Sequence, residues 1–276
     1  GHAISELVHQ AMTRTINMHA PMFVPTSLNR RFKSAKRTLD DMVLQLIADR
    51  RAGKVVGSGD LMAMLMDVVD EETGERMNDD QLRDEILTLF AAGHETTSMA
   101  VSWTIHELLD TPDVMAKLRA EIGDDVSVER LMRLPYLDAV LKESLRKDPP
   151  VWNVARYVEN DDELAGHRIP KGELVFAAQW LMHRHPKHWR DPLRFDPERF
   201  LDDAANDARP KYAYFPFLGG PRKCIGDQLS LLESKIILAK LVTTFDFARE
   251  PGHDVVPDPA ITLRMKNGLW VRARRR

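Results

Sequence analysis

The chain is almost devoid of cysteine, with Cys224 alone among its 276 residues. One cysteine cannot form an internal disulfide, and by itself it cannot build a zinc or iron–sulfur site. A secretory signal is also lacking, and the low cysteine content is consistent with a reducing compartment, so we expect a cytoplasmic location for this chain. No apolar run approaches the roughly 18 residues that a membrane-spanning helix needs, so we expect no membrane segment in this chain.

The chain also lacks an excess of positive charge. Its 39 Lys and Arg residues and 42 Asp and Glu residues give a formal net charge of −3, which argues against a nucleic-acid partner. Aromatic residues are few, at 7%, whereas methionines number 13, which suits an adaptable apolar interior around a bulky ligand.

Helical periodicity dominates the first half of the chain. The pattern predicts helices over 2–19 and 27–52, a short segment near 59–69, and one long helix from about 79 to 109. Asn78 is the expected N-cap of the long helix, with Gln81 placed for a capping box. Two further helices are expected to begin at Pro112 and Pro135, because proline favours the first helical position.

The pattern changes after Pro149-Pro150. The stretch 168–179 is typical of strands, and 261–263 with 269–271 suggests a terminal strand pair. Residues 183–216 have little periodicity, and so long an irregular segment is uncommon unless something pins it. The sequence therefore predicts a mainly α fold with small β-sheets.

Cys224 lies in a distinctive string, Phe217-Leu-Gly-Gly-Pro-Arg-Lys-Cys-Ile-Gly226. Glycines permit unusual turns, the neighbouring Arg222 and Lys223 favour a thiolate, and an apolar helical run starts directly after Gly226. A sulfur at this place meets the unpaired N–H donors and positive dipole end of a helix. Three interpretations stay open from the residues alone: a small buried hydrophobe, a nucleophile that needs a histidine base, or an axial haem ligand.

Two further patterns carry chemistry. Glu143 and Arg146 lie three residues apart on one helix face, and Arg199 follows within the irregular segment; the alternative is three unrelated surface charges. The string 91–97, Ala-Ala-Gly-His-Glu-Thr-Thr, interrupts the long helix near its middle, either as an ordinary kink or as a helix opened over a cofactor.

The pattern F-x-x-G-x-R-x-C-x-G resembles the haem-binding loop of the cytochrome P450 family, and all five specified positions match. The resemblance implies haem b as cofactor, with Cys224 as the axial iron ligand. It further implies roles for the residues around the sulfur: Phe217 beneath the porphyrin, Arg222 and Arg156 on the propionates, and Gly220 and Gly226 in the loop whose N–H groups tune the sulfur.

The other two patterns resemble motifs of the same family. Glu143, Arg146 and Arg199 correspond to a buried triad that locks the irregular segment behind the haem. In the long helix, Ala92 and Gly93 leave room for dioxygen, Thr96 supplies a hydrogen bond during oxygen activation, and Glu95 helps to deliver protons. His94 falls in a variable slot and is expected to lie on the helix face.

The resemblance implies a haem-thiolate monooxygenase that inserts one oxygen atom of O2 into a hydrophobic small molecule. Its electrons would come from a redox partner, either a ferredoxin, a flavodoxin or a reductase. We expect one domain over residues 1–276 that corresponds to the later part of the family fold, with the N-terminal helices and strands absent. Such a chain should alone bind haem poorly and expose a large apolar face. The alternatives are a haem-binding protein without turnover, an inactive truncated fragment, or a structural helical domain.

Overall fold

The computed structural model describes residues 21–54 and 59–276, and the helix expected over 2–19 lies outside these ranges. The chain divides into two compact units, with the boundary between His94 and Glu95. Each unit is described by itself below.

The first unit contains α2 (Ser27–Arg51), α3 (Leu61–Asp67) and the first half of α4 (Asp79–Asp110). The predicted capping box opens α4: Asn78 N–H donates to Gln81 Oε1 at 3.0 Å, and Gln81 N–H donates to Asn78 Oδ1 at 2.9 Å. These bonds satisfy two N–H groups that a helix otherwise leaves unpaired. The helices expected over 27–52 and 79–109 are confirmed.

The expected interruption of the long helix is wrong, because α4 is continuous through residues 91–97. Its polar side chains return their hydroxyls to carbonyls of the same helix, as Ser98 Oγ does to the Glu95 carbonyl at 2.9 Å. Such bonds leave the main-chain ladder intact, so one glycine and two threonines lower the helix propensity without breaking the helix.

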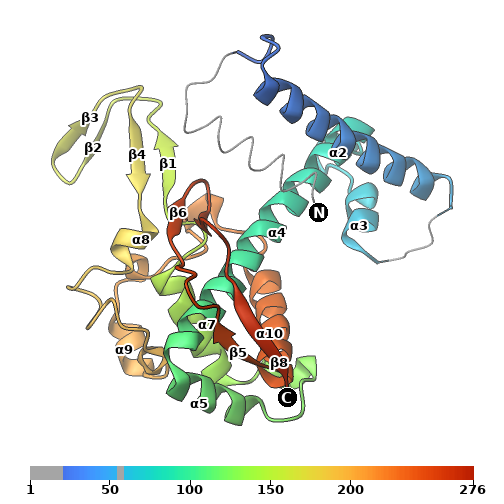
Figure 1. Ribbon diagram of the computed structural model, residues 1–276. Helices are drawn as coiled ribbons and strands as arrows, with labels where there is room; N and C mark the ends of the chain where they lie inside the picture. The colour runs from blue at the N-terminus through green and yellow to red at the C-terminus, as the bar shows by residue number, and fades with distance from the viewer. Residues whose placement is uncertain (1–20, 55–58) are drawn as a thin grey trace. The chain divides into compact units, whose positions relative to one another are not determined.

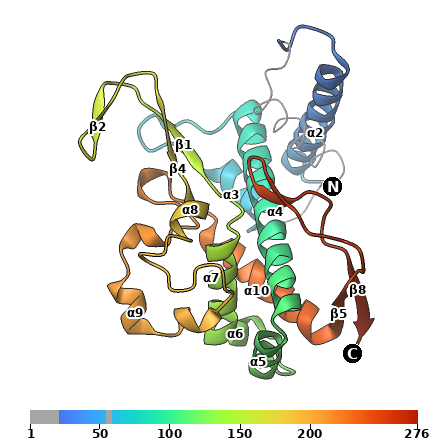
Figure 2. The same cartoon turned by 60° about the vertical axis from the view of Figure 1, so that its left-hand side comes forward.

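Four helical segments build the core of the second unit: the second half of α4, α5 (Pro112–Ile122), α7 (Pro135–Lys147) and α10 (Asp227–Thr244). Figures 1 and 2 both show α4, α7 and α10 side by side. Their inner faces bury a continuous apolar cluster that includes Leu108, Leu118, Leu137, Leu141, Leu238 and Val242. Proline is the first residue of α5 and α7, as expected. The short helices α6 (Val128–Leu131) and α8 (Gln179–Met182) complete the helical part.

The strands form antiparallel pairs around this core. They are β1 (Val154–Tyr157) with β4 (Leu174–Ala177), β2 (Asp162–Leu164) with β3 (His167–Ile169), β5 (Phe245–Arg249) with β8 (Val271–Arg275), and β6 (Pro257–Pro259) with β7 (Leu263–Met265).

The predicted pairing of 261–263 with 269–271 is wrong. The first segment leads into β7, which pairs with β6, whereas the second leads into β8, which pairs with β5 directly after α10. Apolar alternation marks a strand but does not say which neighbour completes its hydrogen bonds.

Residues 183–216, which we call the meander, are irregular as expected. They contain only short turns of helix: η1 (Pro197–Phe200), α9 (Asp203–Ala208) and η2 (Lys211–Ala213). Most of the meander's polar groups therefore need partners outside regular structure.

Candidate functional site

Cys224 lies in a tight loop directly before α10. Its N–H donates to the Phe217 carbonyl at 2.9 Å, and η3 (Gly220–Arg222) turns the chain between them. Leu218 and Gly220 both have positive φ, +64° and +69°. This conformation is unfavourable for leucine by roughly 1–2 kcal/mol, so the folded loop holds its backbone in a costly shape.

The loop leaves the thiol of Cys224 exposed. The interpretation as a small buried hydrophobe is therefore wrong. Two apolar side chains that follow it in the chain are exposed as well, Ile225 at 90% and Leu229 at 57%. Gly226 is the N-cap of α10, and a Cβ at that position would meet nothing within 4 Å. An exposed sulfur thus lies at an open helix N-terminus beside exposed apolar side chains.

Two of the expected propionate partners are exposed cations. Within the described ranges Arg222 has no hydrogen bond or ion pair, while Lys223 beside it pairs with Asp227 at 2.7 Å. Arg156 lies on β1, where its Nη1 donates only to the neighbouring Ala155 carbonyl at 2.9 Å. No hydrogen bond among the described residues joins Arg156 to the Cys224 loop.

Residues 95–97 of α4 contact two distant segments of the second unit. Thr97 Oγ1 lies 3.1 Å from Ser230 Oγ on α10, six residues after Cys224. Glu95 Oε1 accepts a hydrogen bond from Thr262 Oγ1 at 2.9 Å. Thr97 is buried, whereas Glu95 and Thr96 are half-buried. The Thr97–Ser230 contact thus joins the string 91–97 of α4 to α10, the helix that follows the Cys224 loop.

The preceding turn of α4 is open. Ala92 and Gly93 are exposed, and a Cβ on Gly93 would meet nothing within 4 Å. His94 is exposed on the helix face, where its ring stacks on Phe90 with centroids 5.7 Å apart.

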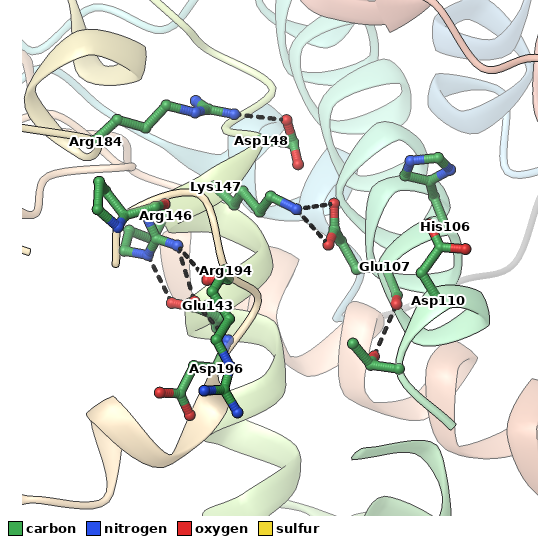
Figure 3. A network of polar contacts seen from close by, with 12 residues as sticks. His106, Glu107, Asp110, Glu143, Arg146, Lys147, Asp148, Arg184, Arg194 and Asp196 are labelled. Atoms are coloured by element: carbon green, nitrogen blue, oxygen red, sulfur yellow. Dashed lines mark hydrogen bonds and ion pairs between the residues drawn. The ribbon is translucent and has the colours of Figure 1, made fainter. Parts of the chain in front are cut away.

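Glu143 and Arg146, both labelled in Figure 3, are buried and form one cluster with the half-buried Arg199. Arg146 Nε and Nη2 donate to the two Glu143 oxygens at 2.7 and 2.9 Å, and Arg199 Nε donates to Glu143 Oε1 at 3.0 Å. The side chains of Glu143 and Arg146 are 0% exposed. A bidentate pair with further hydrogen bonds is the geometry in which a buried ion pair can offset its desolvation.

The same cluster pins the meander. Arg146 also donates to the carbonyls of His183 and Pro192, at 2.9 and 2.8 Å, and Asp196 N–H donates to Glu143 Oε1 at 2.8 Å. One arginine therefore satisfies backbone carbonyls that no helix or strand covers.

Sequence reasoning missed a second group of buried charges, which Figure 3 shows beside the first. Lys147 Nζ donates to both oxygens of Glu107 on α4, at 2.9 and 2.7 Å. Asp148 accepts from Arg184 Nη2 at 3.0 Å. Burial raises the pKa of Glu107 and of Asp148, and the paired cations oppose that rise. Nothing in the local sequence around Lys147 and Asp148 indicates these partners.

The comparisons with known proteins agree with this geometry. The cytochrome P450 family model matches residues 1–269, and the chain belongs to this family. It is 36% identical to "Cytochrome P450 4V2" of Rattus norvegicus over 221 residues, which cover 77% of this chain and 42% of that protein. It is 33% identical to "Cyclooctatin synthase" of Streptomyces melanosporofaciens over 276 residues, covering 95% of this chain and 60% of that protein.

A solved structure, the cytochrome P450DA heme domain carrying three substitutions, is similar with a TM-score of 0.89 and 30% identity. The match covers 100% of this chain and 61% of that one. The chain thus spans less than two thirds of the length of these relatives. Among the described residues, no helix is long and apolar enough to cross a membrane.

Family membership implies a haem cofactor, and the residues of the second unit fit one. The donor set includes the sulfur of Cys224 at the N-terminus of α10, and a cysteine sulfur is a known type of ligand to haem iron. Ile225 and Leu229 offer apolar surface that a porphyrin would cover, and the exposed Arg222 offers a cation for a propionate.

Proposed function

We propose that this chain carries the catalytic centre of a haem-thiolate monooxygenase. The reaction is RH + O2 + 2e⁻ + 2H⁺ → ROH + H2O, with an apolar organic molecule as RH. Haem, when bound, supplies the iron at which dioxygen is reduced, and a thiolate ligand promotes O–O cleavage. The observation that carries the proposal is the Thr97–Ser230 contact, because it joins the string 92–97 to the helix that follows Cys224.

The residues around the sulfur have distinct roles. Cys224 would hold the haem iron through its sulfur, and the N–H groups of Ile225 and Gly226 would tune the iron's potential, because hydrogen bonds to a ligating sulfur withdraw its electron density. Phe217 shields the sulfur, Gly220 gives the loop its turn, and Arg222 and Arg156 bind the propionates.

The residues on α4 handle oxygen and protons. Ala92 and Gly93 leave space for a small molecule, which their exposure and the open volume at Gly93 support. Glu95 carries protons inward, and Thr96 holds a hydrogen bond to the reacting oxygen. The Glu143–Arg146–Arg199 triad stabilises the meander and takes no part in the chemistry.

The proposed cofactor is haem b, and the proposed domain is a single one over residues 1–276. A thioether-linked haem needs cysteines besides the iron ligand, and the chain has only Cys224. The family match extends across both compact units, which supports a single domain. Electrons come from a ferredoxin, a flavodoxin or a reductase, and the exposed Lys223 near the thiol suits an acidic partner surface.

The reduced carbon-monoxide difference spectrum tests the ligand. The haem-loaded protein should show the Soret band of thiolate ligation, and Cys224→Ser should lose it. Lys223→Ala is the matched control, because it alters the same loop but keeps the thiol, and it should keep the band. A protein that binds haem without this band contradicts the proposal.

Turnover separates the enzyme from a haem-binding protein. Thr96→Ala should keep the thiolate band but release most of the reducing equivalents as peroxide or water instead of product. Product formed per O2 consumed is the measurement. An unmodified protein that binds haem through thiolate but forms no product from any apolar compound, with a competent reductase present, favours the haem-binding alternative.

A further inference from the structure

The carboxylate of Glu95 is held by a residue from a distant part of the chain. Thr262 lies in the turn before β7, 167 residues further on, and its Oγ1 donates to Glu95 Oε1 at 2.9 Å. The Thr262 side chain is almost fully buried, whereas Glu95 is half-buried. A hydroxyl has one proton to donate, so this bond fixes the direction of the Thr262 O–H.

The turn that carries Thr262 is anchored on both sides. Trp152 Nε1 donates to the Ala260 carbonyl at 2.7 Å, and Trp103 Nε1 donates to the Leu263 carbonyl at 2.9 Å. Leu263 N–H donates to the Pro150 carbonyl at 2.7 Å. Since Trp103 is itself on α4, the turn is tied to the helix that bears Glu95 at a second place. The hydroxyl is therefore presented to the carboxylate from a rigid support.

This arrangement leaves the two carboxylate oxygens of Glu95 in different situations. Oε1 accepts from Thr262, whereas Oε2 has no hydrogen-bond partner among the described residues. We propose that Thr262 is a positioning residue for the proton relay: it holds Glu95 by Oε1 so that Oε2 stays free to take up and release protons. This inference rests on the proposed function.

The proton balance of this role is simple. Each proton enters from solvent, resides on Glu95 Oε2 and leaves to the oxygen being reduced, while Thr262 keeps its own proton throughout. Thr262 therefore does not touch the reacting atoms. Without its hydroxyl, Glu95 would lose the fixed rotamer on which rapid transfer depends, because transfer needs hydrogen-bond distance.

The competing explanation is that the Thr262–Glu95 hydrogen bond only holds the turn against α4 and has no part in proton transfer. Three variants separate the two. Thr262→Val removes the hydroxyl at nearly constant shape, and Thr262→Ser keeps the hydroxyl. Thr104→Val is the matched control, because Thr104 is a buried threonine of α4 whose hydroxyl donates to the Ala100 carbonyl at 2.7 Å, away from Glu95.

The first measurement is product formed per O2 consumed by the haem-loaded variants. Thr262→Val should lower this ratio at least threefold with an unchanged thiolate band, while Thr262→Ser should stay within twofold of the unmodified protein. Thr104→Val should leave the ratio unchanged. A purely structural contact would lower the stability of Thr262→Val without this selective loss of coupling.

The second measurement does not depend on activity. In a double-mutant cycle of urea unfolding, Thr262→Val and Glu95→Ala should be non-additive by at least a threefold factor in the unfolding constant. Thr104→Val with Glu95→Ala should be additive.

Each failure has its own signature. If the unmodified protein lacks the thiolate band, the proposed function fails and the relay role falls with it. If the band is present in every variant and Thr262→Val stays coupled, only the role of Thr262 is overturned. Additivity in the cycle, or equal uncoupling by serine and valine, also overturns it.

Discussion

At the scale of single residues, His183 shows how the second unit controls charge. It is fully buried at the start of the meander, and its Nε2 accepts a hydrogen bond from Phe215 N–H at 2.9 Å. Burial, assisted by the nearby Arg146, lowers the pKa of His183 to about 3. The imidazole is therefore neutral in the folded protein at any ordinary pH, and folding opposes its protonation.

A pH dependence of stability follows. The unfolded chain binds a proton at His183 below pH about 6.5, while the folded chain does not until pH about 3, so stability from this residue is complete above 6.5 and is lost as pH falls. Between pH 7.5 and 5.5 the unmodified protein should lose about 1 kcal/mol more unfolding free energy than His183→Gln. Urea unfolding at the two pH values measures this.

The exposed His185 supplies the control. It lies two residues further on in the same segment, so His185→Gln makes the same substitution without removing a buried imidazole. Equal pH dependence in His183→Gln and the unmodified protein would contradict a neutral buried imidazole.

The sequence predicts the members of the site better than their partners. Glu95, Thr96 and Cys224 fall in short strings whose spacing is itself the signal. Thr262 and Ser230 are ordinary residues, and their contacts with Glu95 and Thr97 span 167 and 133 positions. Only the folded chain brings such residues together, so no local pattern marks them.

At the scale of elements, ion pairs hold α7 to its neighbours. Lys147 on α7 pairs with Glu107 on α4, and Arg184, two residues after α8, pairs with Asp148, the C-cap of α7. Burial makes each of these charges dependent on its partner, since an unpaired charge there loses its hydration without compensation. Lys147 and Asp148, at the end of α7, lie beside the apolar core, so their charges must be paired there.

Removing one partner should cost more than removing both. Lys147→Met leaves the Glu107 carboxylate buried without its cation, and we expect a loss of about 2 kcal/mol in unfolding free energy. The double variant Lys147→Met with Glu107→Leu should recover most of that loss, because no unpaired charge remains. Denaturant unfolding of the two variants measures this.

Lys142 on the same helix is the control, because its 2.7 Å pair with Asp138 is partly exposed. Lys142→Met should cost less than about 0.5 kcal/mol. If the double variant has a lower free energy of unfolding than Lys147→Met alone, the Lys147–Glu107 attraction stabilises the fold by more than its desolvation costs.

At the scale of the whole molecule, helix bounds followed from the sequence more closely than strand pairing did. Capping residues and prolines are local signals, and they mark the starts of α4, α5 and α7. β8 pairs with β5 and not with residues 261–263. The position of β5 depends on where α10 ends, and the packing of α10 in the core sets that position. Tertiary packing therefore determines the strand pairing, which the local sequence pattern does not specify.

The exposed apolar side chains near Cys224 predict which segment a bound porphyrin stabilises. Ile225 and Leu229 expose apolar surface that a porphyrin would remove from water, so haem should stabilise the folded loop by mass action. Hydrogen exchange of amides in 217–230 should slow on haem addition, by a factor that grows with the haem concentration. Amides of α2 belong to the other unit, hold none of the proposed haem contacts, and should be unaffected.

Cys224→Ser should weaken this protection at equal haem concentration, since the proposed iron–sulfur bond would be lost while the apolar contacts would remain. Equal slowing in α2 and in 217–230 would indicate non-specific adsorption of haem to apolar surface. Slower amide exchange in 217–230 but not in α2, with less slowing in the serine variant, would mean that the loop around Cys224 contacts the haem. The sulfur would be part of that contact, because the serine variant differs from the unmodified protein only in a hydroxyl in place of the thiol.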